Sequence, residues 1–233
     1  IPVLSVGAGY VSRIGWSAEG YGRVLYVTHP ELGLTSVYAH LESFSPKIAR
    51  LTDSLLMAGC AFDLDVDLSA ALLPVAKGEE IGKSGNTGSS TGPHLHFELR
   101  NTQTERALNP LDYGINLADN RAPFFKQIGM VRRMESGLDS LWVIQKVSSG
   151  NGYRPSFLEN AKAYPAGHWS VVFEAEDRVN GSGFRTDLRR IRMWVDDRLL
   201  FEWKVDSIDF KDSRYINAHL MYNQSLKGLR LRR

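Results

Sequence analysis

The sequence Gly-Pro-His-Leu-His-Phe-Glu-Leu at residues 92–99 carries the strongest structural signal in this chain, and the run Ser-Gly-Asn-Thr-Gly-Ser-Ser-Thr precedes it at residues 84–91. His94 and His96 stand one residue apart in a β-favouring run, so on a strand their side chains share a face. Such a pair suits a metal site, where one ring coordinates a divalent ion and the other binds a nearby water or substrate oxygen. The alternative is a half-buried pair without a ligand. The glycines before the strand leave room for a substrate backbone.

A third histidine lies in another alternating run, Val-Tyr-Ala-His-Leu at residues 37–41. This run follows Arg-Val-Leu-Tyr-Val-Thr-His at residues 23–29, and the turn sequence Pro-Glu-Leu-Gly separates the two. The pattern predicts a β-hairpin that ends near His40. His29, which precedes a proline at a strand end, is interpreted as a polar ring that caps the turn rather than as a ligand.

Three segments together resemble the lysostaphin-type (LytM, M23) zinc metallopeptidases. They are YGRVLYVTHPELGLTSVYAHL at residues 21–41, KGEEIGKSGNTGSSTGPHLHFELR at residues 77–100 and NPLDY at residues 109–113. The resemblance covers residues 1 to about 113 and implies an antiparallel β-sheet peptidase domain. It implies that His96 is a zinc ligand, and that His40 and His94 are the acid/base and transition-state-stabilising pair. In such a site zinc acidifies its bound water and polarises the amide carbonyl, while neighbouring imidazoles move the proton and stabilise the oxyanion.

The other two zinc ligands of that family, a histidine and an aspartate four residues apart, have no counterpart before the strand that opens this chain at residues 1–11. A catalytic zinc site normally takes three protein ligands. We expect the N-terminal metal-binding motif upstream of Ile1, because the chain begins in mid-strand, and we expect partial or no zinc in a chain that starts there. The alternative is a natural variant without metal.

The expected fold is all-β, with a peptidase domain at residues 1–114 that contains an insertion at about 47–76. Residues 47–56 have the apolar spacing of a helix, and Asp63, Asp65 and Asp67 follow. Alternating carboxylates could serve calcium. However, the glycine and glutamate of a calcium loop are absent, so we interpret residues 63–67 as an edge strand with one wet face.

Residues 115–233 are expected to form a second domain, an immunoglobulin-like β-sandwich that is incomplete at its C-terminus. Strand candidates at residues 140–146, 169–175, 190–195 and 199–205 alternate with turns rich in Asn, Gly and Asp, without intervening helices. Residues 191–203 predict a hairpin whose Trp194 and Trp203 pack in the sandwich core, the alternative being stacking on sugar rings. A LytM-like domain followed by a β-sandwich is similar to envelope peptidases of Bacteroidetes-type bacteria.

Composition limits the classes of partner. A net charge of +2 and arginine clusters without aromatic interleaving argue against nucleic acid. No run of about 18 apolar residues is present, so we expect no membrane span. Cys60, the one cysteine, can form no internal disulfide. His168 and His219 lie outside the resemblance and are interpreted as surface or hydrogen-bonded residues.

The resemblance implies a zinc metalloendopeptidase of the cell envelope, periplasmic or associated with the outer membrane. Its partner would be the peptide part of peptidoglycan, cleaved at cross-links or stem peptides. The alternative is an inactive LytM-like domain that binds peptidoglycan or regulates another hydrolase. A third hypothesis makes the second domain a docking module for envelope assembly.

Overall fold

The computed structural model describes residues 1–59, 62–133, 139–146, 167–212, 220–221 and 231–232. The chain divides into two compact units. The first comprises Ile1–Gly114 and Ser207–Phe210, and the second comprises Ile115–Asp206 and Lys211–Arg233. In the described part of the chain, no helix has both the length and the apolar character to cross a membrane.

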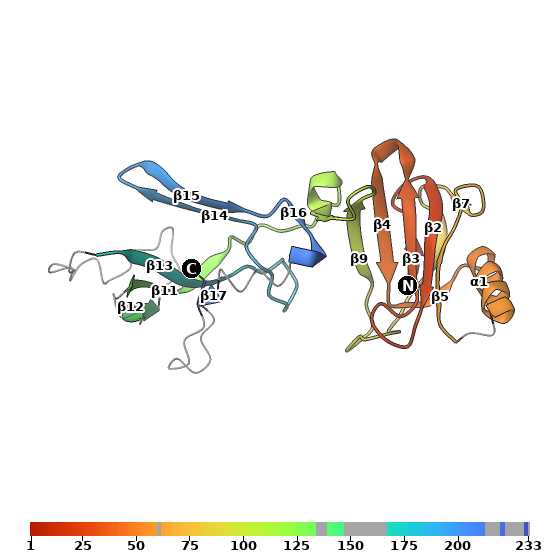
Figure 1. Cartoon of the computed structure of the whole chain (residues 1–233), viewed down its shortest axis with the longest axis horizontal. Coiled ribbons are helices and arrows are strands. Elements are labelled where there is room, and N and C mark those ends of the chain that lie inside the picture. The colour runs from red at the N-terminus through yellow and green to blue at the C-terminus, as the bar shows by residue number, and fades with distance from the viewer. Residues whose placement is uncertain (60–61, 134–138, 147–166, 213–219, 222–230, 233) are drawn as a thin grey trace. The chain divides into compact units, whose positions relative to one another are not determined.

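The first unit is built from antiparallel sheets, as the alternating runs predict, and strands β9, β4, β3 and β2 stand side by side in Figure 1. Its elements are β1 (Pro2–Leu4), β2 (Gly9–Trp16), β3 (Val24–His29), η1 (Pro30–Leu32), β4 (Leu34–Ala39), β5 (Leu41–Phe44), α1 (Pro46–Gly59), β6 (Leu64–Asp67), β7 (Pro74–Val75), β8 (Glu80–Ser84), β9 (His96–Asn101), β10 (Ala107–Leu108), η2 (Pro110–Tyr113) and β16 (Ser207–Ile208). The large sheet has the order β16-β10-β9-β4-β3-β2-β6, with β7 also paired to β2, and a smaller sheet has the order β1-β8-β5. The predicted hairpin of β3 and β4 is confirmed, with Leu25 opposite Tyr38.

The two faces of the large sheet differ in chemistry. One face supplies the core, where Ile14, Leu25 and Val27 pack with Ile48 of α1 and Ile81 of β8. Side chains alternate along each strand, so the positions between these core residues face the opposite way. On β9 those positions carry His96, Glu98 and Arg100. These polar residues therefore lie on the face of the large sheet opposite to the one that packs against the core.

The segment between β5 and β8 contains the helix and the edge strand that its sequence pattern predicts. Helix α1 begins at Pro46 and buries Ile48 and Thr52. Strand β6 pairs with β2 and ends the order of the large sheet, and its aspartates are exposed. Arg13 binds Asp65 with two hydrogen bonds, Nε to Oδ1 at 2.7 Å and Nη2 to Oδ2 at 2.6 Å. This carboxylate is therefore engaged by a guanidinium, in agreement with the edge-strand interpretation.

The second unit is also antiparallel. Its strands are β11 (Phe124–Arg133), β12 (Asp139–Lys146), β13 (Trp169–Glu176), β14 (Arg190–Val195), β15 (Arg198–Lys204), β17 (Leu220–Met221) and β18 (Leu231–Arg232). Five of them form a sheet of order β12-β11-β13-β18-β17, and β14 and β15 form a separate hairpin. The strand predictions for this half are thus confirmed within a residue or two, while the immunoglobulin-like layering stays a prediction.

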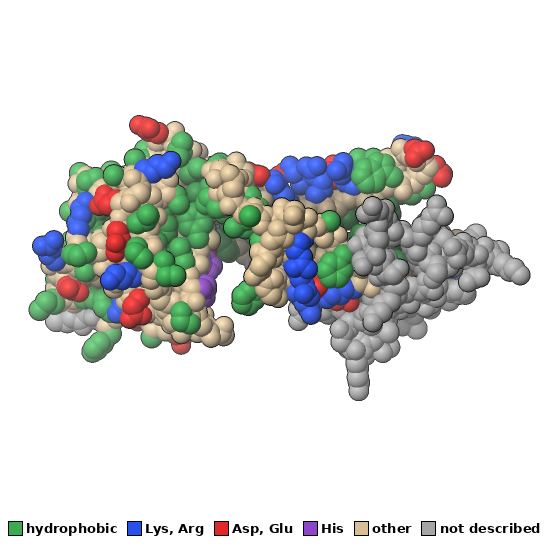
Figure 2. Space-filling model, turned by 180° about the vertical axis from the view of Figure 1, so that it is seen from behind, with side chains coloured by type: hydrophobic (Ala, Val, Ile, Leu, Met, Phe, Trp, Pro, Cys, Tyr) green, Lys and Arg blue, Asp and Glu red, His purple; other side chains and the backbone are tan. Residues whose placement is uncertain are grey.

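The hairpin of β14 and β15 turns at Asp196 and Asp197, whose φ angles of 48° and 60° are those of a type I′ turn. Trp194 is 51% exposed, and Phe201 on the partner strand is 44% exposed. The prediction that Trp194 packs in a sandwich core is therefore wrong, because an aromatic residue at an alternating position does not reveal whether a second layer covers it. Figure 2 shows Lys/Arg and apolar side chains together along this hairpin.

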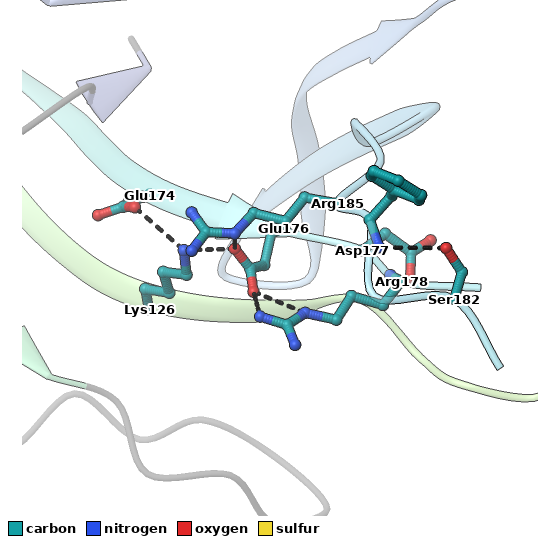
Figure 3. A network of polar contacts seen from close by, with 8 residues as sticks. Lys126, Glu174, Glu176, Asp177, Arg178, Ser182 and Arg185 are labelled. Atoms are coloured by element: carbon teal, nitrogen blue, oxygen red, sulfur yellow. Dashed lines mark hydrogen bonds and ion pairs between the residues drawn. The ribbon is translucent and has the colours of Figure 1, made fainter. Parts of the chain in front are cut away.

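A charged cluster marks the end of β13 (Figure 3). The side chain of Glu176 is only 6% exposed and contacts Lys126, Arg178 Nη2 at 2.8 Å and Arg185 Nε at 3.1 Å. The hydrogen bond from Lys126 lowers the pKa of Glu176; burial opposes this shift, and the hydrogen bond from Arg178 adds to it. A buried carboxylate is stable only when cations or donors compensate its lost hydration, so this cluster ties β11 and β13 to the segment that follows them.

Candidate active site

Three histidines from separate segments meet at one end of the large sheet. His40 lies between β4 and β5, His96 begins β9, and His94 forms an isolated bridge with Gly85. The His40 ring centroid is 4.8 Å from that of His94 and 5.6 Å from that of His96. Histidine side chains also reach the surface of the first unit in Figure 2. The structure thus brings together all three residues that the sequence singles out.

Hydrogen bonds determine which ring nitrogen of His40 and which ring nitrogen of His94 carries the proton. Nδ1 of His40 lies 2.8 Å from the carbonyl oxygen of Thr87, and Nδ1 of His94 lies 2.8 Å from that of Gly92. A carbonyl oxygen can only accept, so each Nδ1 donates and the neutral ring keeps its lone pair on Nε2. Both rings therefore have an unprotonated Nε2 nitrogen, and the two ring centroids are 4.8 Å apart.

His96 has the opposite arrangement. Its Nε2 lies 2.6 Å from Oε1 of Glu98, two residues further along the same face of β9. The carboxylate accepts the Nε2 proton and leaves Nδ1 of His96 with the lone pair. A carboxylate that binds the second nitrogen of a histidine is the usual support of a metal-ligating imidazole, because it fixes the tautomer and makes the ring a stronger donor.

Glu98 is held by more than His96. The hydroxyl of Tyr21 donates to Oε1 of Glu98 at 2.5 Å, and Nε of Arg100 donates to Oε2 at 2.7 Å. Burial by itself would raise the pKa of Glu98, but the hydrogen bonds from His96, Tyr21 and Arg100 outweigh it and lower the pKa to about 2. Burial and the hydrogen bond to Glu98 raise the pKa of Tyr21 to about 12. At neutral pH the pair is therefore a carboxylate and a neutral phenol.

The loop before β9 positions His40 through its backbone. His40 has a left-handed φ of 57°, and its amide donates to the carbonyl of Tyr21 at 2.9 Å. A Cβ atom on Gly88, whose φ is 73°, would lie 2.3 Å from the amide nitrogen of Gly22. The space that this glycine leaves is therefore filled by the chain's own backbone, whereas nothing lies within 4 Å of a Cβ at Gly92. Contact between the two loops places the Thr87 carbonyl against His40.

Sequence reasoning missed three residues of this site. Glu98 and Arg100 could have been found, because they continue the two-residue spacing of His94 and His96 along one strand face. Tyr21 lies in a loop more than 70 residues before β9, and its ring is 5.1 Å from that of His96. No local pattern indicates that contact.

The remaining histidines do not join the site. His29 is buried, and its ring nitrogens bind the Ala8 carbonyl at 2.9 Å and the Ser36 hydroxyl at 2.8 Å. It is thus a hydrogen-bonded core residue rather than a side-chain cap of the turn after it. His168 is exposed, and His219 and Cys60 lie outside the described residues.

The donor set meets only part of what a metal requires. His96 fits one ligand position, because Glu98 supports its Nε2 and no described residue forms a hydrogen bond with its Nδ1. Among the residues that the structure describes, however, no group of three His, Cys, Asp or Glu side chains could hold a metal ion. A catalytic zinc site takes three protein ligands, so the described residues by themselves do not complete one.

Comparison with known proteins finds sequence similarity to peptidases over part of this chain. Residues 70–110 match the model of peptidase family M23. The chain is 37% identical over 110 residues to an uncharacterized metalloprotease of Haemophilus influenzae, an alignment that covers 47% of this chain and 18% of that protein. It is 35% identical over 99 residues to the DD-carboxypeptidase/endopeptidase Mpg of Neisseria meningitidis, covering 42% of this chain and 17% of that protein. The matches thus span less than a fifth of these relatives.

Among solved structures, the catalytic domain of lysostaphin from Staphylococcus simulans is 25% identical to this chain. The comparison covers 48% of this chain and 68% of that domain, with a TM-score of 0.34. The residues matched by the family model include His94, His96 and Glu98. This chain is therefore similar in sequence to peptidase family M23 over residues 70–110.

Proposed function

We propose that this chain contains part of the active site of a zinc metalloendopeptidase that cleaves peptide cross-links or stem peptides of bacterial peptidoglycan. The observation that carries the proposal is that the rings of His94 and His96 lie beside that of His40, with centroids 4.8 Å and 5.6 Å from it, and that the tautomers are complementary. The substrate class is supported by the relatives, which include a DD-carboxypeptidase/endopeptidase and lysostaphin. We propose accordingly that the protein acts in the cell envelope, in the periplasm or associated with the outer membrane.

We assign a different role to each kind of histidine in this site. His96 offers Nδ1 as a metal ligand, since Glu98 occupies its Nε2. His40 and His94 each offer Nε2, and their ring centroids are 4.8 Å apart. Amide hydrolysis needs one group to take a proton from the attacking water and another to stabilise charge on the carbonyl oxygen. A neutral imidazole suits the first task and a protonated one the second, so the pair can serve both.

A second candidate function is binding of peptidoglycan without hydrolysis, or regulation of another hydrolase. The observation in its favour is the donor count, because His96 is the one clear ligand among the described residues. Against it, His40 and His94 are held through Nδ1, and no described residue forms a hydrogen bond with their Nε2 nitrogens. A binding scaffold has no need of such a pair.

Digestion of purified sacculi by the complete product of the gene, loaded with zinc, separates the two functions. We expect soluble muropeptides from the wild type, and a loss of about 100-fold or more in rate for His94→Ala and for His40→Ala. His168→Ala, which changes an exposed histidine outside the site, is the matched control and should keep full activity. Binding of sacculi without released muropeptides would favour the scaffold, and full activity of His94→Ala would refute the assigned role.

A further inference from the structure

A short segment from late in the chain completes the sheet that carries the candidate site. We call Ser207–Phe210 the strap. It belongs to the first unit, although the chain on both sides of it belongs to the second. Its strand β16 pairs antiparallel with β10, Ile208 opposite Ala107 and Ser207 opposite Leu108, and β10 pairs with β9. The strap is therefore two strands from the one that bears His96.

Side-chain contacts hold the strap in register. Nε of Arg106 donates to the hydroxyl of Ser207 at 2.9 Å, and Nη1 of Arg106 lies 3.3 Å from Oδ2 of Asp209. Nη2 of the same arginine lies 3.5 Å from the Ser207 carbonyl oxygen. A guanidinium has several donors in fixed geometry, so one residue fixes both the position and the direction of the strap.

Phe210, at the end of the strap, reaches the hydrogen-bond network of the site. The guanidinium carbon of Arg100 lies 4.8 Å from the centroid of the Phe210 ring, a cation–π contact. The Arg100 side chain is 11% exposed. It donates to Glu98 through Nε at 2.7 Å and to the Tyr21 hydroxyl through Nη2 at 3.2 Å. Phe210 is thus linked to His96 through two consecutive side chains.

We propose that Phe210 is a positioning residue of the candidate active site, acting through Arg100 and Glu98 on the imidazole of His96. An arginine side chain has many rotamers, and its hydrogen bonds form only in a few of them. A ring against the guanidinium restricts that freedom and excludes water from one side of the network. Arg100 then keeps its Nε on Glu98, and Glu98 keeps the Nε2 proton of His96.

The other role of such a segment is to cover a sheet edge, since an unpaired strand edge promotes association. The two roles use different parts of the strap. Edge protection depends on the backbone of Ser207 and Ile208 and on Arg106, whereas the site depends on the ring of Phe210. A substitution at Phe210 can therefore test the second role while the strand pairing stays in place.

The experiment is NMR of the full metal-free chain at one fixed pH, with exchange rates measured for the Nε proton of Arg100 and the Nε2 proton of His96. Phe210→Ala should make both exchange about threefold to fivefold faster, because one side of the network loses its cover. Phe210→Tyr, which keeps the aromatic face, should restore the wild-type rates. Phe62→Ala changes a phenylalanine that is 98% exposed and should have no effect.

Amide exchange at Ile208 reports whether the strap remains paired. If Phe210→Ala unpairs the strap, the exchange rates of Arg100 and His96 are measured instead in Phe210→Leu, which keeps apolar bulk without the aromatic face. Unchanged Arg100 and His96 exchange in a variant with an intact strap would overturn the proposal. The functional consequence rests on the proposed peptidase activity, but this measurement does not, so failure of the sacculus digestion and failure of this inference are separate results.

Discussion

The carboxylate of Glu98 accepts hydrogen bonds from Tyr21, His96 and Arg100, and its charge orients the candidate ligand. Tyr21→Phe removes one donor and leaves the ring in place. We expect the pKa of Glu98 in the metal-free protein to rise from about 2 by about one unit or more, because a hydrogen bond to the charged form is lost. Carboxyl carbon chemical shifts in a pH titration measure this change.

The lowered pKa of Glu98 makes the stability of the first unit depend on pH. The folded-state pKa of Glu98 lies below the ordinary value of 4.5, so its stabilising contribution is present above pH 4.5 and is lost as the pH falls toward 2. In Tyr21→Phe that loss begins at higher pH. Tyr113→Phe, at a tyrosine that is 50% exposed, is the matched control. An unchanged titration of Glu98 in Tyr21→Phe would show that the other two donors suffice.

The sequence alone identifies some residues of the site and not others. His40, His94 and His96 can be chosen from short motifs, and the two-residue period of a strand extends the choice to Glu98. Tyr21 and Phe210 cannot be chosen, because their roles depend on loops and pairings between residues far apart in the chain. Such contacts leave no periodic trace in a single sequence.

The loop between β8 and β9 depends on a glycine that meets the backbone of another loop. Gly88 has a φ of 73°, and a Cβ there would lie 2.5 Å from the carbonyl oxygen of Gly20 and 2.3 Å from the amide nitrogen of Gly22. Gly88→Ala should therefore lower the free energy of unfolding of the first unit by roughly 1–3 kcal/mol. It should also displace the Thr87 carbonyl from Nδ1 of His40. Chemical denaturation and the ring nitrogen shifts of His40 test the two effects.

Gly92→Ala is the matched control in the same loop, since nothing lies within 4 Å of the position that its added methyl group would take and its φ is not left-handed. It should change the free energy of unfolding by less than about 0.5 kcal/mol. If Gly88→Ala were as stable as Gly92→Ala, the close contact of the two loops would not exist in solution.

A substitution in the type I′ turn between β14 and β15 should raise the free energy of unfolding rather than lower it. Asp197 has a φ of 60°, a conformation that costs an L-residue about 1–2 kcal/mol, while glycine adds about 0.5–1 kcal/mol of chain entropy to the unfolded state. Asp197→Gly should therefore raise the free energy of unfolding of the second unit by about 0.5–1 kcal/mol. Asp196→Asn, which tolerates the same conformation, should be neutral. A destabilised Asp197→Gly in urea denaturation would contradict the assigned turn.

Elements whose contacts are local are those that the sequence predicts well. The hairpins β3–β4 and β14–β15 follow from alternating runs joined by turn residues, and α1 follows from its apolar spacing. The two-residue strand β16 does not, because its partner β10 lies about 100 residues earlier and so short a strand has no alternation to detect. The covering of a strand face, which decides the exposure of Trp194, is likewise a property of the assembled unit.

For the whole molecule, the strap changes how the second unit can be studied. Removing residues 115–233 to test a docking role would also remove Ser207–Phe210, so a loss of hydrolysis would have two explanations. Phe210→Ala in the full chain separates them, because it alters the link to Arg100 while every strand of the second unit remains. A docking role would then be measured by localisation and the positioning role by the exchange of His96.

The charged cluster around Glu176 should make the stability of the second unit depend on acid. Its lowered pKa means that the carboxylate stabilises the fold above the ordinary value of 4.5, and that this contribution is lost as the pH falls through the folded-state pKa. Glu176→Gln leaves Lys126, Arg178 and Arg185 without their shared anion. We expect a lower unfolding temperature at pH 7 and a difference from the parent protein that shrinks below pH 4.5.

The distribution of tryptophan allows this effect to be measured in one unit. Trp16 is the one tryptophan of the first unit, and the other four belong to the second. In a Trp16→Phe background, fluorescence therefore follows the second unit alone. Glu202→Gln, which removes an exposed carboxylate 3.5 Å from Arg190, is the matched control and should shift the transition far less. A pH-independent difference between Glu176→Gln and its parent would mean that packing, rather than charge, accounts for the role of Glu176.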